Sequence, residues 1–223
     1  MNTHPLPRPV TGGRVTPEKL VRLRAAELRK LTRKRQFDQV AIGHGFSDSA
    51  SFERFVTALH DIAGIDYEGL RQVEAARRSV HRRLVTMAQR GPQLRLFSAA
   101  TMTTFTICRA DGHVIWHNRF PRECVIDTGT AAAETSARQA IWLAGQARVQ
   151  WGADAATLHL VLARNRGVEL VKLHETAVAA ALVLEVSTDP VHHPAAEQCT
   201  RPTFIDWCGT DLGGLLEPPQ EPA

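Results

Sequence analysis

The sequence predicts an α+β fold, in which a helical N-terminal region precedes a region of strands and one long helix. The spacing of apolar residues supports this, because it changes near Pro92 from about 3.6, the period of a helix, to about 2, the period of a strand. The charge changes at the same place. Residues 1–91 hold 17 Lys and Arg against 9 Asp and Glu, a net charge of +8, whereas residues 92–223 have a net charge of −4.

The first 91 residues read as a tail followed by helices. Residues 1–15 contain three prolines and two adjacent glycines, which predicts a flexible tail. Residues 16–91 form the expected basic helical region. Its first helix begins at Thr16-Pro17-Glu18, which combines a hydroxyl cap, a proline suited to the first turn and an acid near the positive helix end. This helix is expected to end before Gly43.

Two more helices are expected in this region. One begins near Ser47-Asp48, ends at Gly64 and places one apolar face inward: Phe52, Phe55, Val56, Leu59 and Ile62. The other begins at Asp66, closes at Gly91-Pro92 and has five apolar residues expected to face inward: Leu70, Val73, Val80, Leu84 and Met87.

Residues 92–189 are expected to form the α+β domain. Alternation over 104–107 and 114–120 around Asp111-Gly112 predicts a β-hairpin, because this dipeptide tolerates positive φ angles. A long helix is expected over Thr130–Trp151, followed by strands at 158–162 and 168–173. Residues 179–186 fit either a third strand or a buried helix end. Residues 190–223 read as a proline-rich extension.

Composition excludes several classes of protein. The longest unbroken apolar run, Ala177 to Leu184, is far shorter than the roughly 20 residues of a membrane helix, and the N-terminus lacks a secretory h-region. The four cysteines are therefore expected to be reduced thiols. We expect a soluble, cytoplasmic protein without a membrane partner.

Residues 73–189 resemble the roadblock (dynein light chain) family. The likeness rests on residues 105–115 (FTICRADGHVI), on the small-residue helix around Ala137, Ile141 and Ala144, and on residues 166–170 (RGVEL). The resemblance implies a roadblock-like sandwich of a hairpin, a long helix and three strands. It also implies a dimeric module that has no active site of its own and often regulates a small GTPase. On this interpretation the chain is a non-enzymatic regulatory or scaffolding protein and a homodimer.

The same region also resembles a degenerate ribonuclease H. Residues 96–101 (LFSAAT) lie where that family has its first metal-binding aspartate, Glu134 matches the helix glutamate, and residues 193–199 (HPAAEQC) match the histidine-containing late loop. Ala99, Ala163 or Arg164, and Thr200 stand where three further acids are expected, and one carboxylate does not hold two magnesium ions. This alternative implies a catalytically inactive nucleic-acid binder.

Residues 45–54 (GFSDSASFER) resemble the recognition-helix motif of AraC-type regulators, which implies a second alternative, a DNA-binding transcriptional regulator. The cations that would contact an anionic partner are the run in residues 29–35 and one residue of this motif. They are Arg29, Lys30, Arg33, Lys34, Arg35 and Arg54. A solvated helix face explains the same charges.

The alanine-rich helix is the expected dimer contact, through Ala137, Ile141, Trp142 and Ala144. We expect no catalytic residue, no metal and no cofactor. His192-His193 with Cys199 and Cys208 lack the paired spacings of a zinc site, and no phosphate-binding glycine loop or nucleophile motif is present.

Overall fold

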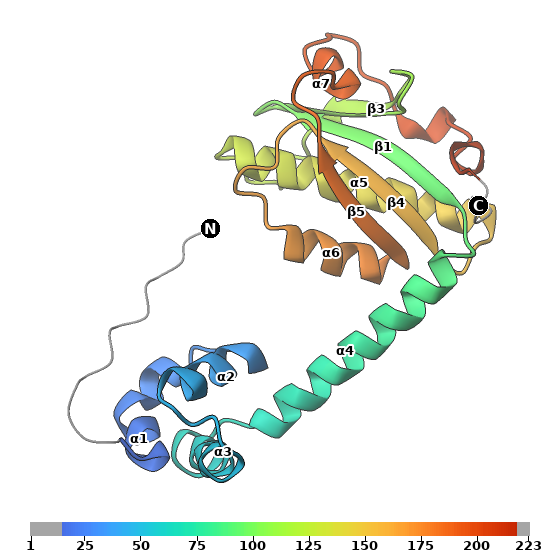
Figure 1. The fold of residues 1–223 in the computed structure, drawn as a ribbon. Coiled ribbons are helices and arrows are strands. Elements are labelled where there is room, and N and C mark those ends of the chain that lie inside the picture. Colours follow the sequence, from blue (N-terminus) through green and yellow to red (C-terminus); the bar gives the residue numbers. More distant parts are fainter. Residues whose placement is uncertain (1–14, 218–223) are drawn as a thin grey trace. The chain divides into compact units, whose positions relative to one another are not determined.

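The computed structural model describes residues 15–217, which divide into two units between Val80 and His81 (Figure 1). The first unit is helical and the second contains a five-stranded mixed sheet with helices, so the predicted α+β class is confirmed. Residues 1–14 of the predicted N-terminal tail and residues 218–223 of the predicted C-terminal extension lie outside the described residues. No helix within 15–217 is long and apolar enough to span a membrane.

Three helices and the start of a fourth build the first unit: α1 (Pro17–Leu28), α2 (Lys34–Gly43), α3 (Ser49–Ala63) and α4 (Tyr67–Ala88). The predicted caps hold two of them in place. The Thr16 hydroxyl accepts the Lys19 N–H at 3.4 Å, and the Asp48 carboxylate accepts the Ser51 N–H at 2.9 Å. Gly64 ends α3 with φ +66°, a conformation that glycine adopts without strain. The core of the unit contains Val21, Phe37, Phe55 and Leu59.

The single helix expected from Thr16 to Gly43 is two helices, because a side chain caps a new helix start in its middle. The Gln36 side-chain oxygen accepts the backbone N–H groups of Thr32 and Arg33, each at 3.0 Å. These bonds satisfy donors that an unbroken helix would pair with carbonyls four residues earlier. Residues 29–33 therefore turn between α1 and α2.

Helix α4 does not bury the whole stripe predicted for it. Leu84 is 4% exposed and packs with Ala88 and Ala155 of the second unit's core, whereas Val73 and Val80 are 53% and 57% exposed. The boundary between units thus falls within this helix, earlier than the predicted boundary after residue 91.

The second unit contains β1 (Gln93–Ala100), β2 (Thr104–Cys108), β3 (Val114–Arg119), α5 (Gly129–Trp151), β4 (Ala156–Leu162), α6 (Leu170–Ala179) and β5 (Leu182–Thr188). Helix α7 (Pro194–Gln198) and two 3-10 turns, Trp207–Gly209 and Gly213–Leu215, follow. The strand order is β3-β2-β1-β4-β5. Strands β1, β2 and β3 are antiparallel neighbours, whereas β1, β4 and β5 are parallel.

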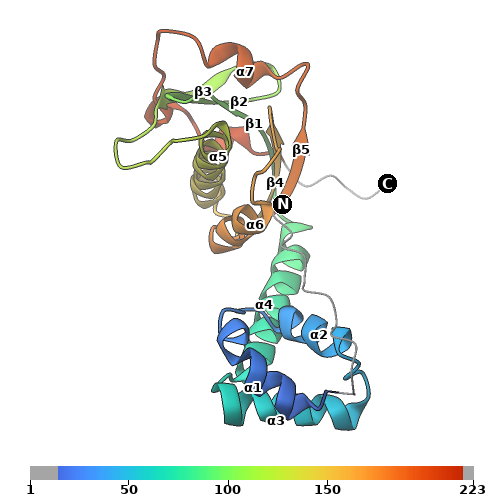
Figure 2. The ribbon, with the colours of Figure 1, turned by 90° about the vertical axis from the view of Figure 1, so that its left-hand side faces the viewer.

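Strand alternation divides the sheet into two faces. On one face, leucines of β1, β4 and β5 pack against α5 and α6 (Figures 1 and 2). Alanines of α5, including Ala140 and Ala147, allow this helix to approach the sheet closely. The alternate residues, among them Phe97 and Cys108, lie on the other face under α7, where Ala195 and Cys199 cover them.

The predicted hairpin, long helix and three strands need correction in two places. Gln93–Ala100 adds a strand before the hairpin, and residues 168–173, expected as a strand, contain two residues without regular structure and the start of α6. Residues 179–186, expected as either a strand or a helix end, contain both, since α6 ends at Ala179 and β5 begins at Leu182. The parallel pair β4–β5 needs such a crossover helix.

The predicted extension beyond residue 189 is part of the second unit. Its described part, to residue 217, adds α7 and two bridges to strand residues, Gln93 with Glu217 and His117 with Ile205. Leu212 and Leu216 are buried in the core under α5.

Candidate functional site

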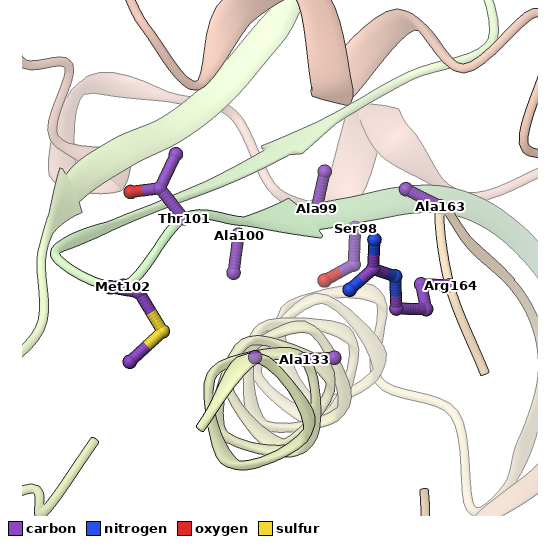
Figure 3. A pocket seen from close by; sticks show the side chains of 9 residues that line it. Ser98, Ala99, Ala100, Thr101, Met102, Ala133, Ala163 and Arg164 are labelled. Atoms are coloured by element: carbon purple, nitrogen blue, oxygen red, sulfur yellow. The ribbon is translucent and has the colours of Figure 1, made fainter. Parts of the chain in front are cut away.

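A pocket of about 500 Å³ opens at the carboxyl ends of β1 and β4, beside the first turn of α5 (Figure 3). We call it the β1–β4 pocket. Nine residues line it: Ser98, Ala99, Ala100, Thr101, Met102, Gly129, Ala133, Ala163 and Arg164. Most of them are small and apolar.

The topology of the sheet explains why a pocket forms here. From β1 the chain turns to its antiparallel neighbour β2, whereas from β4 it crosses through α6 to β5 on the other side. The connections leave two adjacent parallel strands in opposite directions, which opens a crevice at their carboxyl ends. Ligands of open α/β sheets bind at such points.

Two buried serines fix the floor of the β1–β4 pocket. The hydroxyls of Ser98 and Ser136 are 2.6 Å apart, and the Ser136 hydroxyl donates to the Ala99 carbonyl at 3.1 Å. Ser136 has one proton, which goes to Ala99, so Ser98 donates to Ser136. This pair ties β1 to α5 and uses the Ser98 proton, so Ser98 lacks the adjacent general base that an attacking serine needs.

Arg164 supplies the charge of the β1–β4 pocket. It lies two residues after the end of β4, and its exposed side chain extends over the pocket (Figure 3). A Cβ placed on Gly129 would lie 3.5 Å from the Arg164 Nη1, so the guanidinium lies against the first residue of α5. Within residues 15–217 this guanidinium makes no hydrogen bond or ion pair.

The first turn of α5 adds a positive partial charge to that of Arg164. Helix α5 has 23 residues, and its first N–H groups lack intrahelical acceptors. The Thr128 hydroxyl accepts one of them, from Ala131, at 3.1 Å. A guanidinium and a helix N-terminus at one end of a pocket favour an anion.

Glu134, one residue beyond Ala133, does not neutralise this charge. One carboxylate oxygen accepts the backbone N–H of Glu169 at 2.8 Å, and the other lies 3.7 Å from an Arg138 nitrogen. Its side chain is 18% exposed. Glu134 therefore holds the start of α6 against α5.

The residues at the β1–β4 pocket do not fit the two magnesium ions that the ribonuclease H resemblance implies. Ala99 and Arg164 line it without a carboxylate, Glu134 is bonded to the start of α6, and Thr200 is exposed beyond α7. No group of three or more His, Cys, Asp or Glu side chains within 15–217 is placed to hold a metal ion. We therefore derive no metal-dependent step.

His193, of the predicted late loop, has a structural role. Its Nδ1 accepts the Ala196 N–H at 3.3 Å, so Nε2 carries the proton and donates to the Val161 carbonyl at 3.1 Å. Burial lowers the pKa of this imidazole, which favours the neutral ring. The ring packs edge-on against Phe97, with centroids 5.5 Å apart, and docks α7 on the sheet.

Two of the six predicted contact cations, Arg29 and Lys34, are bonded within the first unit. Arg29 Nε donates to the Ala63 carbonyl at 3.0 Å. Lys34 Nζ lies 2.6 Å from Asp38 and 5.5 Å from the centre of the Tyr67 ring. Hydrogen bonding to Asp38 raises the pKa of Lys34.

Of the other four cations, one forms an ion pair and three are exposed. Arg54 holds Glu18 through two bonds, at 2.9 and 3.0 Å, and this bonding lowers the pKa of the glutamate. Lys30, Arg33 and Arg35 are exposed around the start of α2. The six residues therefore do not form one basic surface.

The exposed side of α3, which contains the motif similar to AraC-type regulators, is not basic. Glu53 and Asp61 are exposed there, and Arg54 is paired with Glu18. A DNA-facing helix would carry unpaired cations and amides toward the bases and phosphates.

The predicted dimer helix packs inside its own chain. Ala137 and Ile141 are 0% exposed and Ala144 is 1% exposed, because this stripe of α5 meets the sheet. Trp142 is 40% exposed and packs with Trp116 and Trp207, with ring centroids 5.8 and 5.0 Å away. The side chains of Ala137, Ile141 and Ala144 are therefore buried within their own chain, and of the four predicted contact residues only Trp142 is exposed.

No protein-family model, curated protein or solved structure matches this chain. Sequence reasoning singled out Ala99, Ala163 and Arg164 only as missing acids and gave no role to Met102 or Gly129. The signal for the pocket was nevertheless local: small residues end β1 and open α5, and an arginine lies two residues after β4.

Proposed function

We propose that this protein binds nucleic acid without cleaving it, and that the β1–β4 pocket holds a backbone phosphate. The observation that carries the proposal is Arg164. Its exposed guanidinium has no partner within residues 15–217, lies beside the first residue of α5 and reaches over a pocket at the carboxyl ends of parallel strands.

The chemistry of this arrangement suits a phosphate. The planar fork of a guanidinium donates two parallel hydrogen bonds to a phosphate. The N-terminal turn of a helix offers backbone N–H groups and a positive partial charge to the same group. A carboxylate at position 164 would need a cation to approach a phosphate, whereas an arginine contacts it directly.

The architecture supports the nucleic-acid alternative. The second unit consists, in chain order, of three antiparallel strands, a helix, a parallel strand, a crossover helix and a further parallel strand. This order brings Ala99, Glu134 and Arg164 to one end of the sheet. These are positions on which the likeness to ribonuclease H rests. The roadblock-like alternative, a homodimer acting on a small GTPase, stays a prediction that the burial of Ala137, Ile141 and Ala144 does not favour.

Binding without cleavage follows from the donors present. Two-metal cleavage of a phosphodiester needs several carboxylates that converge on the metals, and Glu134 is engaged with Glu169 and Arg138. The Ser98 proton is held by Ser136. We expect the bound strand to remain intact.

The test compares two arginine variants of the full chain. Fluorescence anisotropy would measure the affinity for a labelled single-stranded RNA, a single-stranded DNA and an RNA–DNA hybrid. We expect Arg164→Ala to weaken binding about 10-fold, the effect of losing a charge-assisted hydrogen bond, and to make the salt dependence shallower by about one phosphate contact.

Arg90→Ala is the matched control, because Arg90 is an exposed arginine of the same unit that does not line the pocket. We expect it to bind like the wild type. Gel analysis of the same strands with magnesium should show no cleavage. The proposal would be rejected if the chain bound none of the three nucleic acids, or if Arg164→Ala and the wild type bound them with equal affinity.

A further inference from the structure

We infer that the β1–β4 pocket receives one whole nucleotide, with its phosphate on Arg164 and its base against Met102, and that it accepts any base. This inference rests on the proposed function, which requires only a phosphate. It follows from the size of the pocket, from the arrangement of its lining and from the state of its polar groups.

The pocket is too large for a phosphate alone. Its volume is about 500 Å³. Pockets that enclose small organic ligands measure about 300–1,000 Å³, and they are mainly apolar with a few placed polar groups. A phosphate at Arg164 would leave most of the space to the group attached to it.

The lining is polar at one end and apolar at the other. Figure 3 shows Arg164 and Met102 on opposite sides of the pocket, with Ala100 of β1 and Ala133 of α5 between them. A ligand that matches this order has an anion at one end and a flat apolar surface at the other. A nucleotide has this form, since every base presents a π face.

The turn that carries Met102 is fixed by hydrogen bonds. Its side chain is 45% exposed, which is large for an apolar group beside a pocket. The Thr101 hydroxyl accepts the N–H groups of Thr103 and Thr104, at 3.2 and 3.0 Å, and so fixes the β1–β2 turn that carries Met102. A thioether contacts aromatic rings favourably and adapts to their shape.

The polar side chains that remain offer no means to distinguish bases. Ser98 is bonded to Ser136, and the Thr101 hydroxyl is bonded within its own turn. Among the side chains that line the pocket, only the Arg164 guanidinium has unused hydrogen-bond donors within the described residues. Discrimination between bases requires hydrogen bonds to their edges, so the pocket should accept purines and pyrimidines alike.

The first experiment needs no variant. Isothermal titration of the full chain would compare adenosine monophosphate, cytidine monophosphate, adenosine and inorganic phosphate. We expect the two monophosphates to bind within about 3-fold of each other, and adenosine and inorganic phosphate each to bind at least 10-fold more weakly. Equal binding of phosphate and monophosphates would overturn the inference, and so would a preference above 30-fold for one base.

The second experiment fills the space for the base. Ala133→Phe adds a ring on α5 facing the pocket, and Val149→Phe adds the same ring to a 60% exposed position of the same helix. We expect Ala133→Phe to weaken monophosphate binding at least 10-fold and Val149→Phe to change it less than 2-fold. Equal binding by the two variants would contradict the inference.

The outcomes separate the inference from the proposed function. If long strands bind through Arg164 while monophosphates bind no better than phosphate, the pocket holds a phosphate only and the inference is wrong. If monophosphates bind as expected but no long strand does, the nucleotide pocket stands and the proposed nucleic-acid function is wrong.

Discussion

The cations of the two units differ in what they contact. In the first unit, Arg29 caps the end of α3, Lys34 bonds to Asp38 and Arg54 holds Glu18. In the second unit, Arg164 extends over a pocket and has no partner within residues 15–217. The first unit is the more basic in sequence, yet half of its candidate cations stabilise its own fold. A single unpaired arginine in a pocket is therefore better evidence for a ligand than a run of cations.

The largest expected effect tests whether the two units are stable independently. Ile141 is fully buried between α5 and the sheet, so Ile141→Ala should lower the free energy of unfolding of the second unit by about 3 kcal/mol. All four tryptophans lie in the second unit and the only tyrosine, Tyr67, lies in the first. Tryptophan fluorescence during urea unfolding therefore reports on the second unit.

Val149→Ala is the control, since this side chain on the same helix is 60% exposed and should change stability by less than about 0.5 kcal/mol. If Ile141→Ala shifted the urea unfolding transition of the first unit together with the tryptophan signal, the two units would not unfold independently.

The next effect compares the cations of the two units directly. Arg164→Glu places a negative charge in the pocket and should weaken binding to a single-stranded RNA about 100-fold, since it removes a charge-assisted bond and adds repulsion. Replacing Lys30, Arg33 and Arg35 together by alanine removes three exposed charges. Anisotropy at two salt concentrations should show a smaller loss for this triple variant, and a larger one would place the interface on the first unit.

The serine pair under the pocket should affect stability moderately. Ser136→Ala leaves the buried hydroxyl of Ser98 without its acceptor and removes the hydrogen bond to the Ala99 carbonyl. An unsatisfied buried group costs about 1–3 kcal/mol, which urea unfolding would measure. Ser49→Ala, at an exposed position of α3, is the matched change in the first unit and should be nearly neutral. Equal effects would mean that the pair does not hold β1 against α5.

Local signals explain what the sequence predicted of this fold. The caps Thr16 and Asp48, the glycine Gly64 and the Asp111-Gly112 turn act within a few residues, and each lies where it was expected. The long helix expected over Thr130–Trp151 is Gly129–Trp151, because its end at Gly152 is also a local signal.

Distant contacts explain what the sequence did not predict. The apolar residues in 168–173 have a spacing that fits a strand or a helix. The helix is favoured because the Glu134 carboxylate, 35 positions away, accepts the Glu169 N–H at the start of α6. The pocket likewise needs β1, β4 and α5 together. Whether Arg164 is paired depends on neighbours in space, which its sequence context does not show.

A weaker effect, the change in the free energy of unfolding with pH, should be confined to the second unit. Burial lowers the pKa of His193 in the folded chain, while the Val161 carbonyl and Asp189 oppose this shift. The unfolded state then binds a proton more readily, so this contribution to stability is complete above the unfolded pKa of about 6.5 and is lost as the pH falls below it. Unfolding of His193→Gln, followed by tryptophan fluorescence, should depend less on pH than that of the wild type. Identical profiles would show that His193 is not the group responsible.

The smallest effect concerns Arg54, the one candidate cation in the segment that resembles a recognition helix. Its two bonds to Glu18 join α3 to α1, but the arginine is 59% exposed, and exposed ion pairs contribute about 0.2–1 kcal/mol. Arg54→Ala should therefore lower stability by less than about 1 kcal/mol and leave affinity for duplex DNA and for single strands unchanged. Glu18→Ala breaks the same pair and frees the guanidinium. If Arg54 contacted a phosphate, Glu18→Ala would strengthen binding and Arg54→Ala would weaken it. Opposite changes in affinity of these two variants would show that the first unit has a nucleic-acid surface. If both variants lose only a little stability and bind as the wild type does, the pocket remains the proposed binding site.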